Sequence, residues 1–403
     1  MAEPSAHGFG APARRPVGRL GLVVLLALGV VALAVMTQAE AADRAGPSTD
    51  PAASDPSTDT AADASAPRPL AFGSVTSQGA IVFRLGEPVH AWSVDAAGDV
   101  RWQRDLARGD YLVCGPCPGA IVKQADGRAV AIDADGRPTD PPIGLAEGLV
   151  DTTSLTGVVL ASTRPDHRTE FVVPTSAGLI AAGSLVDARL DQSLVVVTPA
   201  TDGRAVTVMR TAADPLRQAE FEVVHVTSAG AHVVTVALDE PGARPLPCAV
   251  ADVDSVAYLQ QHQGPTSAGS THVVRRTDDG PPTEATVAGA FDACAAGPDG
   301  VVLATAVTGA DGDPTRTLVD LVWLDASLSA ISHTTEPVAG PSASVAIDAR
   351  SGRVAVAGGT GPSSLLDATS RVERPSAAAV AFDDQGGLWS VDVDLRVHHE
   401  VTP

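Results

Sequence analysis

The feature that most constrains the fold is the spacing of short apolar runs through the body of the chain, residues 69–403. Each run is rich in valine and other β-branched residues and is bounded by Gly, Pro, Asp or Ser, which is the pattern of β-strands separated by turns. Beyond residue 37 no window has the period of about 3.6 residues that marks an amphipathic helix. The clearest runs are 79–83, 156–160, 193–197, 221–226, 232–238, 301–307, 318–324 and 353–357. We therefore expect an all-β body.

Asp-Gly pairs mark the turns between many of these runs. Glycine readily adopts the positive φ that tight hairpin turns need, so consecutive strands are expected to be antiparallel neighbours. The pairs begin at Asp126, Asp135, Asp202, Asp279, Asp299 and Asp311. Near the C-terminal end, residues 389–398 alternate apolar and polar side chains, which predicts one strand with one buried face.

A weak internal repeat underlies this pattern: an apolar strand that ends in Asp, followed by a turn that ends in Gly. It occurs at 90–98, 128–136, 344–352 and 378–386. Repeats of about 40 to 50 residues with four strands each are typical of the blades of a β-propeller. About seven four-stranded blades of about 48 residues would fill 69–403, and six or eight blades are alternatives. A pair of β-sandwich domains, which needs a similar number of strands, is a further alternative.

The segment 89–102 resembles a blade of the quinoprotein (PQQ-repeat) propellers. The repeat of that family is Ala-x-Asp-x-x-x-Gly-x-x-x-Trp, and Asp95, Gly98 and Trp102 match it. The family's enzymes bind pyrroloquinoline quinone and Ca²⁺, with a disulfide between adjacent cysteines, an Asn metal ligand and a Trp in most blades. This chain has no adjacent Cys pair, no Asn and four Trp. The resemblance therefore implies the fold of the family's non-enzymatic members, without a cofactor.

An uncharged apolar run from Leu20 to Met36 follows Arg14, Arg15 and Arg19. Basic residues beside an apolar segment stay on the cytoplasmic side, so the body is expected outside the membrane. At about 1.5 Å per residue the run spans about 26 Å, near the lower limit for crossing a bilayer. We expect a transmembrane helix over 20–37 in a single-pass protein of the cell membrane. A signal peptide cleaved near residue 41, which would leave a secreted body, is the alternative.

The rest of the domain plan follows from this run. Residues 1–19 would form a short cytoplasmic tail. Residues 38–68 are rich in Ala, Pro, Ser, Thr and Asp and have no aromatic side chain, so they are expected to be a disordered linker. Residues 69–403 would form the extracytoplasmic propeller.

The formal net charge of the chain is −21. Nucleic acids and anionic lipid surfaces attract positive charge, so the composition excludes nucleic acid as a partner. The chain has a single lysine, Lys123, and no asparagine, while Arg, Ala, Gly and Val are abundant. This bias is typical of a high-GC genome and indicates an actinobacterial source.

Four cysteines are present: Cys114, Cys117, Cys248 and Cys294. In an exported body an even number predicts disulfides, either Cys114–Cys117 with Cys248–Cys294 or one of the two crossed pairings. The first two cysteines also have the spacing of a thioredoxin-like redox motif, but the Pro-Gly that follows would break the helix that lowers the pKa of such a cysteine. A zinc site would need a second closely spaced pair.

We predict no catalytic, cofactor-binding or metal site. The segments 133–136 and 311–313 resemble fragments of calcium loops, but they lack the spacing of ligands that such loops need and are expected to be hairpin turns. His398 and Glu400 would lie on one face of a strand and could share a metal, although a solvated strand end is the simpler interpretation. The chain has no Gly-x-Ser-x-Gly and no His-Glu-x-x-His motif.

These observations lead us to expect a non-catalytic binding or scaffold module in the bacterial cell envelope. Its partner would be an envelope protein, a peptide or a glycan, and it would contact the membrane through the N-terminal helix. The alternative is an exported propeller enzyme, a glycan hydrolase or lyase or a quinone-dependent dehydrogenase. Paired carboxylates suit glycan chemistry, and acidic residues are plentiful in this chain.

Overall fold

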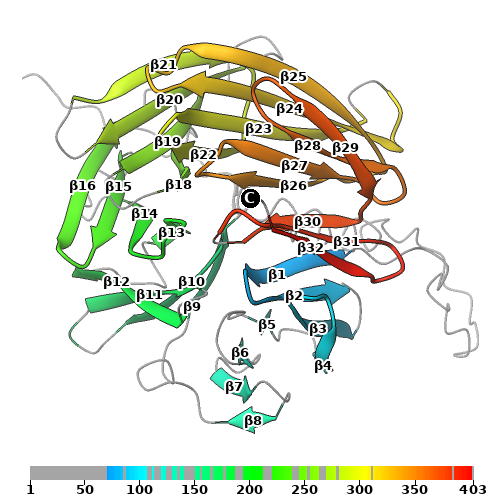
Figure 1. The fold of residues 1–403 in the computed structure, drawn as a ribbon. Coiled ribbons are helices and arrows are strands. Elements are labelled where there is room, and N and C mark those ends of the chain that lie inside the picture. Colours follow the sequence, from blue (N-terminus) through cyan, green and yellow to red (C-terminus); the bar gives the residue numbers. More distant parts are fainter. Residues whose placement is uncertain are drawn as a thin grey trace, which may run out of the picture.

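In the computed structural model, the body is a set of β-sheets arranged around a common centre (Figure 1). The structure describes residues 70–401 except the stretches 85–87, 107–110, 113–118, 124–128, 134–136, 140–149, 155–156, 164–165, 167, 176–177, 187–193, 212–219, 238–244, 252–254, 263–268, 278–280, 310–311 and 384. The predicted tail (1–19), transmembrane helix (20–37) and linker (38–68) lie outside these residues. Within the described part of the chain, no helix has the length and apolar character needed to cross a membrane.

The first four sheets contain sixteen strands, which follow one another along the chain. Their bounds are β1 (Leu70–Thr76), β2 (Gly79–Arg84), β3 (Val89–Asp95), β4 (Val100–Leu106), β5 (Tyr111–Leu112), β6 (Gly119–Lys123), β7 (Ala129–Asp133), β8 (Pro138–Thr139), β9 (Val150–Ser154), β10 (Gly157–Thr163), β11 (Arg168–Thr175), β12 (Gly178–Val186), β13 (Leu194–Pro199), β14 (Ala205–Thr211), β15 (Glu220–Thr227) and β16 (Gly230–Ala237).

The other four sheets contain the remaining described strands. Their bounds are β17 (Pro245–Pro247), β18 (Ala249–Val250), β19 (Ser255–His262), β20 (Ser270–Thr277), β21 (Thr283–Ala288), β22 (Ala293–Gly297), β23 (Gly300–Thr308), β24 (Arg316–Asp325), β25 (Ala330–Ala339), β26 (Ser344–Asp348), β27 (Arg353–Ala357), β28 (Pro362–Leu366), β29 (Arg371–Ser376), β30 (Ala379–Phe382), β31 (Leu388–Val391) and β32 (Val397–Glu400).

The described residues form eight sheets, and the contacts that close the ring join seven of them. Six of the sheets have four strands. The sheet β18-β22-β23-β24-β25 has five, because β18 adds in parallel to β22, and the last sheet, β30-β31-β32, has three. Apart from β18, the named strand pairs are antiparallel, as the Asp-Gly turns predicted.

Contacts between the sheets close a ring. Strand β30 packs against β26 on one side and against β1 on the other, so the last sheet meets the first. Strand β1 also contacts β10 of the third sheet, while β5–β8 lie beyond β1–β4 at the periphery of the view (Figure 1). Such radial stacking of small sheets is the architecture of a β-propeller, and it differs from the two sandwiches considered as an alternative.

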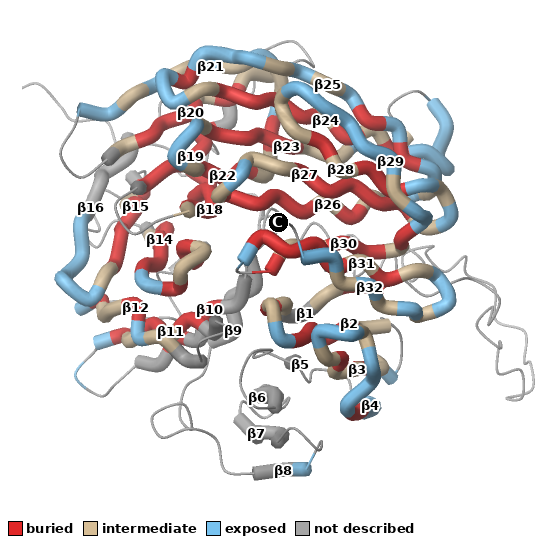
Figure 2. The backbone as a smooth tube through the Cα atoms, viewed as in Figure 1, coloured by how far each residue is buried: buried red, intermediate tan, exposed pale blue. Residues whose placement is uncertain are grey.

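The core lies between the faces of neighbouring sheets. One apolar cluster joins Leu259 and Val273 to Leu303 and Val322 across two sheets, and Figure 2 shows buried residues along β23, β26 and β30. A central strand covered on both faces needs apolar side chains on both, which is why Val301–Ala304 are all buried and the sequence shows continuous Val-rich runs. Each buried valine or leucine contributes about 1.5–3 kcal/mol.

The strand predicted over 389–398 is wrong in one respect: the structure divides it into β31 and β32. A turn separates them, because the Asp392 Oδ1 atom accepts hydrogen bonds from the backbone N–H groups of Asp394 and Arg396, both at 2.9 Å. Leu395 adopts a positive φ of 68° in this turn. An Asp side chain that bonds to its own backbone favours a turn over a strand, and the alternating pattern does not reveal it.

Candidate functional site at the junction of the first and last sheets

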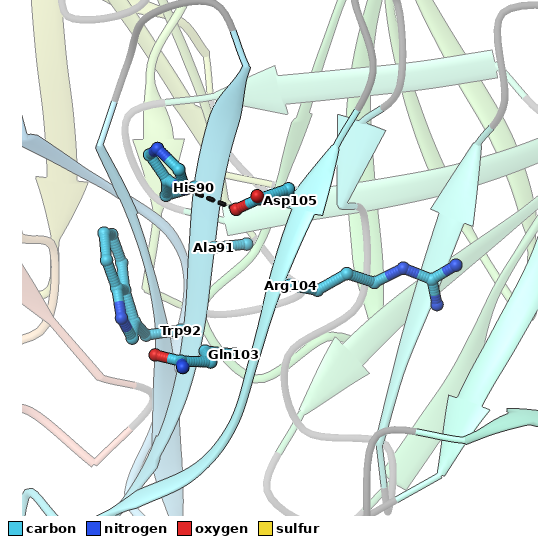
Figure 3. A pocket seen from close by; sticks show the side chains of 6 residues that line it. All are labelled: His90, Ala91, Trp92, Gln103, Arg104 and Asp105. Atoms are coloured by element: carbon cyan, nitrogen blue, oxygen red, sulfur yellow. Dashed lines mark hydrogen bonds and ion pairs between the residues drawn. The ribbon is translucent and has the colours of Figure 1, made fainter.

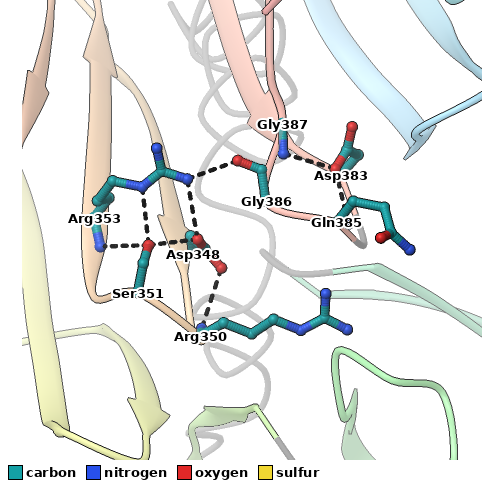
Figure 4. A network of polar contacts seen from close by, with 8 residues as sticks. All are labelled: Asp348, Arg350, Ser351, Arg353, Asp383, Gln385, Gly386 and Gly387. Carbon is teal, nitrogen blue, oxygen red and sulfur yellow. Dashed lines mark hydrogen bonds and ion pairs between the residues drawn. The ribbon is translucent and has the colours of Figure 1, made fainter. Parts of the chain in front are cut away.

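The Asp of the internal repeat closes a hairpin turn with its side chain. The Asp95 Oδ1 atom accepts hydrogen bonds from the backbone N–H groups of Ala97 (2.9 Å) and Asp99 (3.0 Å). Asp383 Oδ1 does the same with two N–H groups of its own turn, both at 2.8 Å (Figure 4). The repeated Asp therefore has a structural role, as the turn interpretation predicted.

The other two residues of the repeat in segment 89–102 are structural as well. Gly98 has a φ of +87°, which an L side chain rarely adopts. Trp102 is buried and packs with Ile81 and Ala91. The residues that carry the resemblance to the quinoprotein propellers thus hold a hairpin and a core together.

Two arginines, each held in an ion pair, link neighbouring sheets. Arg353 pairs with the buried Asp348 and donates a hydrogen bond of 2.7 Å to the carbonyl of Gly386 in the next hairpin (Figure 4). Glu336 of β25 is buried and receives hydrogen bonds from Ser364 Oγ (2.6 Å) and from Arg371 Nη2 (2.7 Å). The hydrogen bond and charge of the Glu336 carboxylate raise the pKa of Arg371.

The last sheet leaves one edge without a partner strand among the described residues, namely β32. The backbone carbonyl of Arg396 accepts a hydrogen bond from the N–H of Asp392, so alternate pairing aims the backbone groups of Val397 and His399 away from β31. The β3–β4 turn covers the first of these, since a Cβ on Gly98 would lie 2.5 Å from the Val397 carbonyl oxygen. The backbone groups of His399 face the free edge.

Next to this edge, the first sheet leaves a tryptophan partly uncovered. Trp92 lies opposite Val82 in the sheet, and Val82 packs against Val391 of the last sheet, so both side chains lie on the same face. The other three tryptophans are all buried. Trp92 is the only one of the four that is partly exposed.

A shallow pocket of about 300 Å³ lies at the same place. His90, Trp92, Gln103 and Asp105 line it from β3 and β4, and Figure 3 shows these side chains on one side of the sheet with Arg104 pointing away. His90 is hydrogen-bonded to Asp105 through Nδ1. The guanidinium of Arg84 lies 5.5 Å from the centre of the Trp92 ring, a cation–π distance.

On the other side of the last sheet, β29 leaves a second apolar side chain exposed. Val372 is 45% exposed and pairs with Leu365, which packs in the cluster shared with the last sheet. Arg374 forms an ion pair with Glu400 at 3.0 Å, while its buried Nε atom has no hydrogen-bond partner. We use "the junction" for the surface made by Trp92, Gln103, Val372, Arg374 and the free edge of β32.

The two residues considered above as a metal pair, His398 and Glu400, have different surroundings. His398 is exposed, and Glu400 pairs with Arg374. The side chain of His399, on the opposite face, is buried; its Nε2 atom lies 2.8 Å from Asp383 Oδ2 and its ring stacks on Trp389 with the ring centres 4.2 Å apart. This cluster secures the last sheet, and the sequence alternation hid it because the turn at 392–396 reverses the chain.

Cys248 and Cys294 form a disulfide, in agreement with one of the predicted pairings. Cys248 lies between β17 and β18, so the bond ties the sheet of β17 to that of β22. Cys114 and Cys117 lie outside the described residues.

The residues present do not fit the cofactor of the quinoprotein enzymes. In the regions that the structure describes, no group of three or more His, Cys, Asp or Glu side chains could hold a metal ion. Asp313, one of the residues in the calcium-like segments, bonds to Thr315 in an exposed turn, and these hydrogen bonds lower its pKa. The chain also lacks Asn, the amide ligand of that family.

No family model matches the sequence, and no curated protein is recognisably similar to it. Among solved structures, the chain is similar to BamB from Moraxella catarrhalis, with 11% identity and a TM-score of 0.41 over 81% of this chain and 92% of that one. A chain of a mitotic checkpoint complex has 11% identity and a TM-score of 0.37 over 89% and 100% of the two chains. The WD40 domain of Toxoplasma gondii coronin has 11% identity and a TM-score of 0.35 over 82% and 79%.

The sequence did not reveal the junction. Trp92 lies inside the segment 89–102 that resembles a propeller repeat, where a tryptophan is expected to be buried. Nothing in the sequence pattern distinguishes it from the buried Trp102.

Proposed function

We propose that this protein is a membrane-anchored extracytoplasmic β-propeller that acts as a non-catalytic binding or scaffold module in the bacterial cell envelope. The N-terminal helix holds it in the membrane with the N-terminus in the cytoplasm. Its partner is an envelope protein, a peptide or a glycan that contacts the loops at a rim of the ring.

The binding role is supported by the buried carboxylates of the described residues, which are all hydrogen-bonded or ion-paired within the fold. Asp348, Asp383 and Glu336 are buried, and each is engaged by neighbouring groups that hold turns or sheets together. Carboxylates tied up in this way stiffen a ring and are not free to act on a substrate. A rigid ring with loops at both rims is suited to present a preformed surface, which limits the entropy lost on binding.

The disulfide supports the proposed location. Disulfides persist in oxidising compartments and are rare in the cytosol of mesophiles. A Cys248–Cys294 bond therefore suits a body on the outer side of the membrane, which is also the side that Arg14, Arg15 and Arg19 predict.

Location is tested with reporters fused to the full-length protein. A reporter that is active only outside the cytoplasm, fused after residue 403, is expected to be active, and a tag at residue 1 to remain with the membrane at full length. Loss of the N-terminal tag from the mature protein would show cleavage and a secreted body. A C-terminal reporter that is active only in the cytoplasm would contradict the proposal.

Binding is tested by placing a photo-crosslinking side chain at each rim in living cells. Asp313 and Ser327 lie in turns at opposite ends of β24, and both are exposed. Ile331, which is 59% exposed on the outer strand β25, is the matched control away from both rims. We expect one rim position to form a discrete adduct that the control does not form; equal labelling from all three positions would contradict a rim-binding module.

A further inference from the structure

We propose that the pocket formed by His90, Trp92, Gln103 and Asp105 binds a neutral glycan, with one pyranose ring stacked on the Trp92 indole. This site goes beyond the proposed function, because it is built from the strands β3 and β4 rather than from the loops at a rim. Glycan binding there requires neither the proposed membrane anchor nor a partner at the rim.

The register of the first sheet places five side chains in two rows on one face. Arg84, His90 and Asp105 lie directly opposite one another on β2, β3 and β4 and form the first row. Trp92 and Gln103 are directly opposite each other and form the second row. Directly opposite residues of an antiparallel pair share a face, with Cβ atoms about 4.5–5.5 Å apart, and residues two apart on one strand share it as well. A single small ligand can therefore contact both rows.

Trp92 supplies an apolar platform that is already fixed in place. The Arg84 guanidinium lies 5.5 Å from the centre of its ring, and the His90 ring lies 6.1 Å away at a tilt of 40°. The Trp92 side chain is partly exposed, so a ligand can reach it. The C–H face of a pyranose ring is an apolar surface that can lie on an indole. Because neighbouring side chains hold the indole, stacking costs little side-chain entropy.

The polar groups beside this platform suit a ligand with many hydroxyl groups. The Arg84 guanidinium can only donate hydrogen bonds, the Asp105 carboxylate can only accept them, and the Gln103 amide does both. Each sugar hydroxyl donates and accepts, so one sugar can satisfy all three groups. Gln103 is exposed, and the Asp105 side chain is 64% exposed, so both are open to a ligand.

The charges and the size of the pocket favour a neutral ligand over an ionic one. Arg84 and Asp105 have opposite charges at the two ends of one row, so a cation would meet the first and an anion the second. The net charge of −21 also repels acidic polymers. The pocket volume of about 300 Å³ lies at the lower end of the range of about 300–1,000 Å³ for ligand sites. It suits one or two rings of a longer chain.

The test uses the full-length protein in a detergent without a sugar headgroup, and cellohexaose as the probe. Cellohexaose is neutral, and its β-linked glucose rings carry equatorial substituents, which leaves apolar C–H faces on each ring. Saturation-transfer NMR from protein to sugar detects binding. Acrylamide quenching of fluorescence locates it, since Trp92 is the only tryptophan that is partly exposed.

We expect saturation transfer to cellohexaose and about a twofold fall in the quenching of Trp92 at saturation. Trp92→Ala should weaken binding more than about tenfold, whereas Trp92→Phe should keep the transfer and lose the fluorescence change. Gln103→Ala should weaken binding about fivefold, the effect of one hydrogen bond. Arg104→Ala is the matched control and should bind like wild type, because Arg104 is exposed and points away from the other pocket side chains (Figure 3).

No transfer to cellohexaose in the wild-type protein would overturn the proposal, and so would transfer that persists in Trp92→Ala. If the tryptophan variants do not fold, the exposed Gln103 decides: equal binding by Gln103→Ala and Arg104→Ala would contradict the site. Tetramethylammonium and polygalacturonate are the cationic and acidic probes, and binding of either in place of cellohexaose would also overturn a neutral-glycan site. The reporter and rim-crosslinking experiments use other residues, so their outcomes are independent of this one.

Discussion

The ion pair between Glu336 and Arg371 gives a quantitative test of how the sheets are held together. The Glu336 side chain is 7% exposed, whereas that of Arg371 is 48% exposed. Removing the arginine leaves a buried carboxylate with Ser364 as its remaining side-chain partner, but removing the glutamate leaves an arginine that can reach water. The two truncations therefore should not cost the same.

Breaking a buried pair by removing one partner costs about 3–5 kcal/mol, and the exposure of Arg371 reduces this because solvent screens its charge. We expect Arg371→Ala to lower the free energy of unfolding by about 2–3 kcal/mol and Glu336→Ala by about 1–2 kcal/mol. The double variant should resemble Glu336→Ala, because the uncompensated charge is gone. The coupling energy from the cycle then equals the cost of Arg371→Ala, about 2–3 kcal/mol.

The assay is urea denaturation of the full-length protein and the three variants, followed by far-UV circular dichroism at low and high salt. Arg374→Ala, which removes an arginine of the same strand from a more exposed pair, is the control and is expected to cost about 1 kcal/mol or less. The reasoning is refuted if Glu336→Ala costs as much as Arg371→Ala, or if the two truncations are simply additive.

Three further predictions concern the disulfide, a glycine and an aspartate. Cys248→Ser should lower stability by at most about 4 kcal/mol, from the sequence separation of 46 residues that the bond closes, and reductant should abolish the difference from wild type in thermal unfolding. Gly387→Ala should cost about 3 kcal/mol in urea denaturation, because its Cβ would lie 2.5 Å from Asp383 Oδ2, whereas Gly359→Ala, with open space around it, should cost about 1 kcal/mol. Hydrogen bonds from its turn lower the pKa of Asp367 to about 2, so its stabilising effect is complete above about pH 4 and is lost as the pH falls toward 2.

Each of these predictions has an outcome that would contradict it. A Cys248→Ser protein as stable as wild type without reductant would show that the bond does not restrain unfolding. Equal costs for the two glycine variants would mean that the Asp383–His399 pair can move aside. The stability difference between wild type and Asp367→Ala, about 1 kcal/mol near pH 5 after allowance for solvent screening, should shrink toward zero at pH 2; a constant difference would contradict the hydrogen-bond explanation.

The strands were predictable because packing between sheets demands them. Runs such as 301–307 and 353–357 are apolar on both faces, and a sheet covered on both faces needs that composition. The repeated Asp was predictable too, since a side chain that caps its own turn acts within a few residues. All-β class and four-stranded units follow from such local signals.

The junction could not be predicted, because it depends on which elements meet. Trp92 and Trp102 lie on the same hairpin and have similar neighbours in the sequence, yet one is buried and the other is not. The difference lies in the neighbours that the fold gives to each side chain, since Trp102 packs with Ile81 and Ala91. The number of blades could not be predicted either. In the sequence, a turn between two strands of one sheet resembles a connection between two sheets, so the strands cannot be divided into blades.

Residues 245–250 belong to two sheets at once, first as β17 beside β19 and then as β18 beside β22. Because the two sheets share this segment, we expect them to unfold together. The Cys248–Cys294 disulfide also links them covalently. The slowest-exchanging amides of these two sheets should therefore report the same free energy of local unfolding. Other adjacent sheets, which share no segment, can unfold separately.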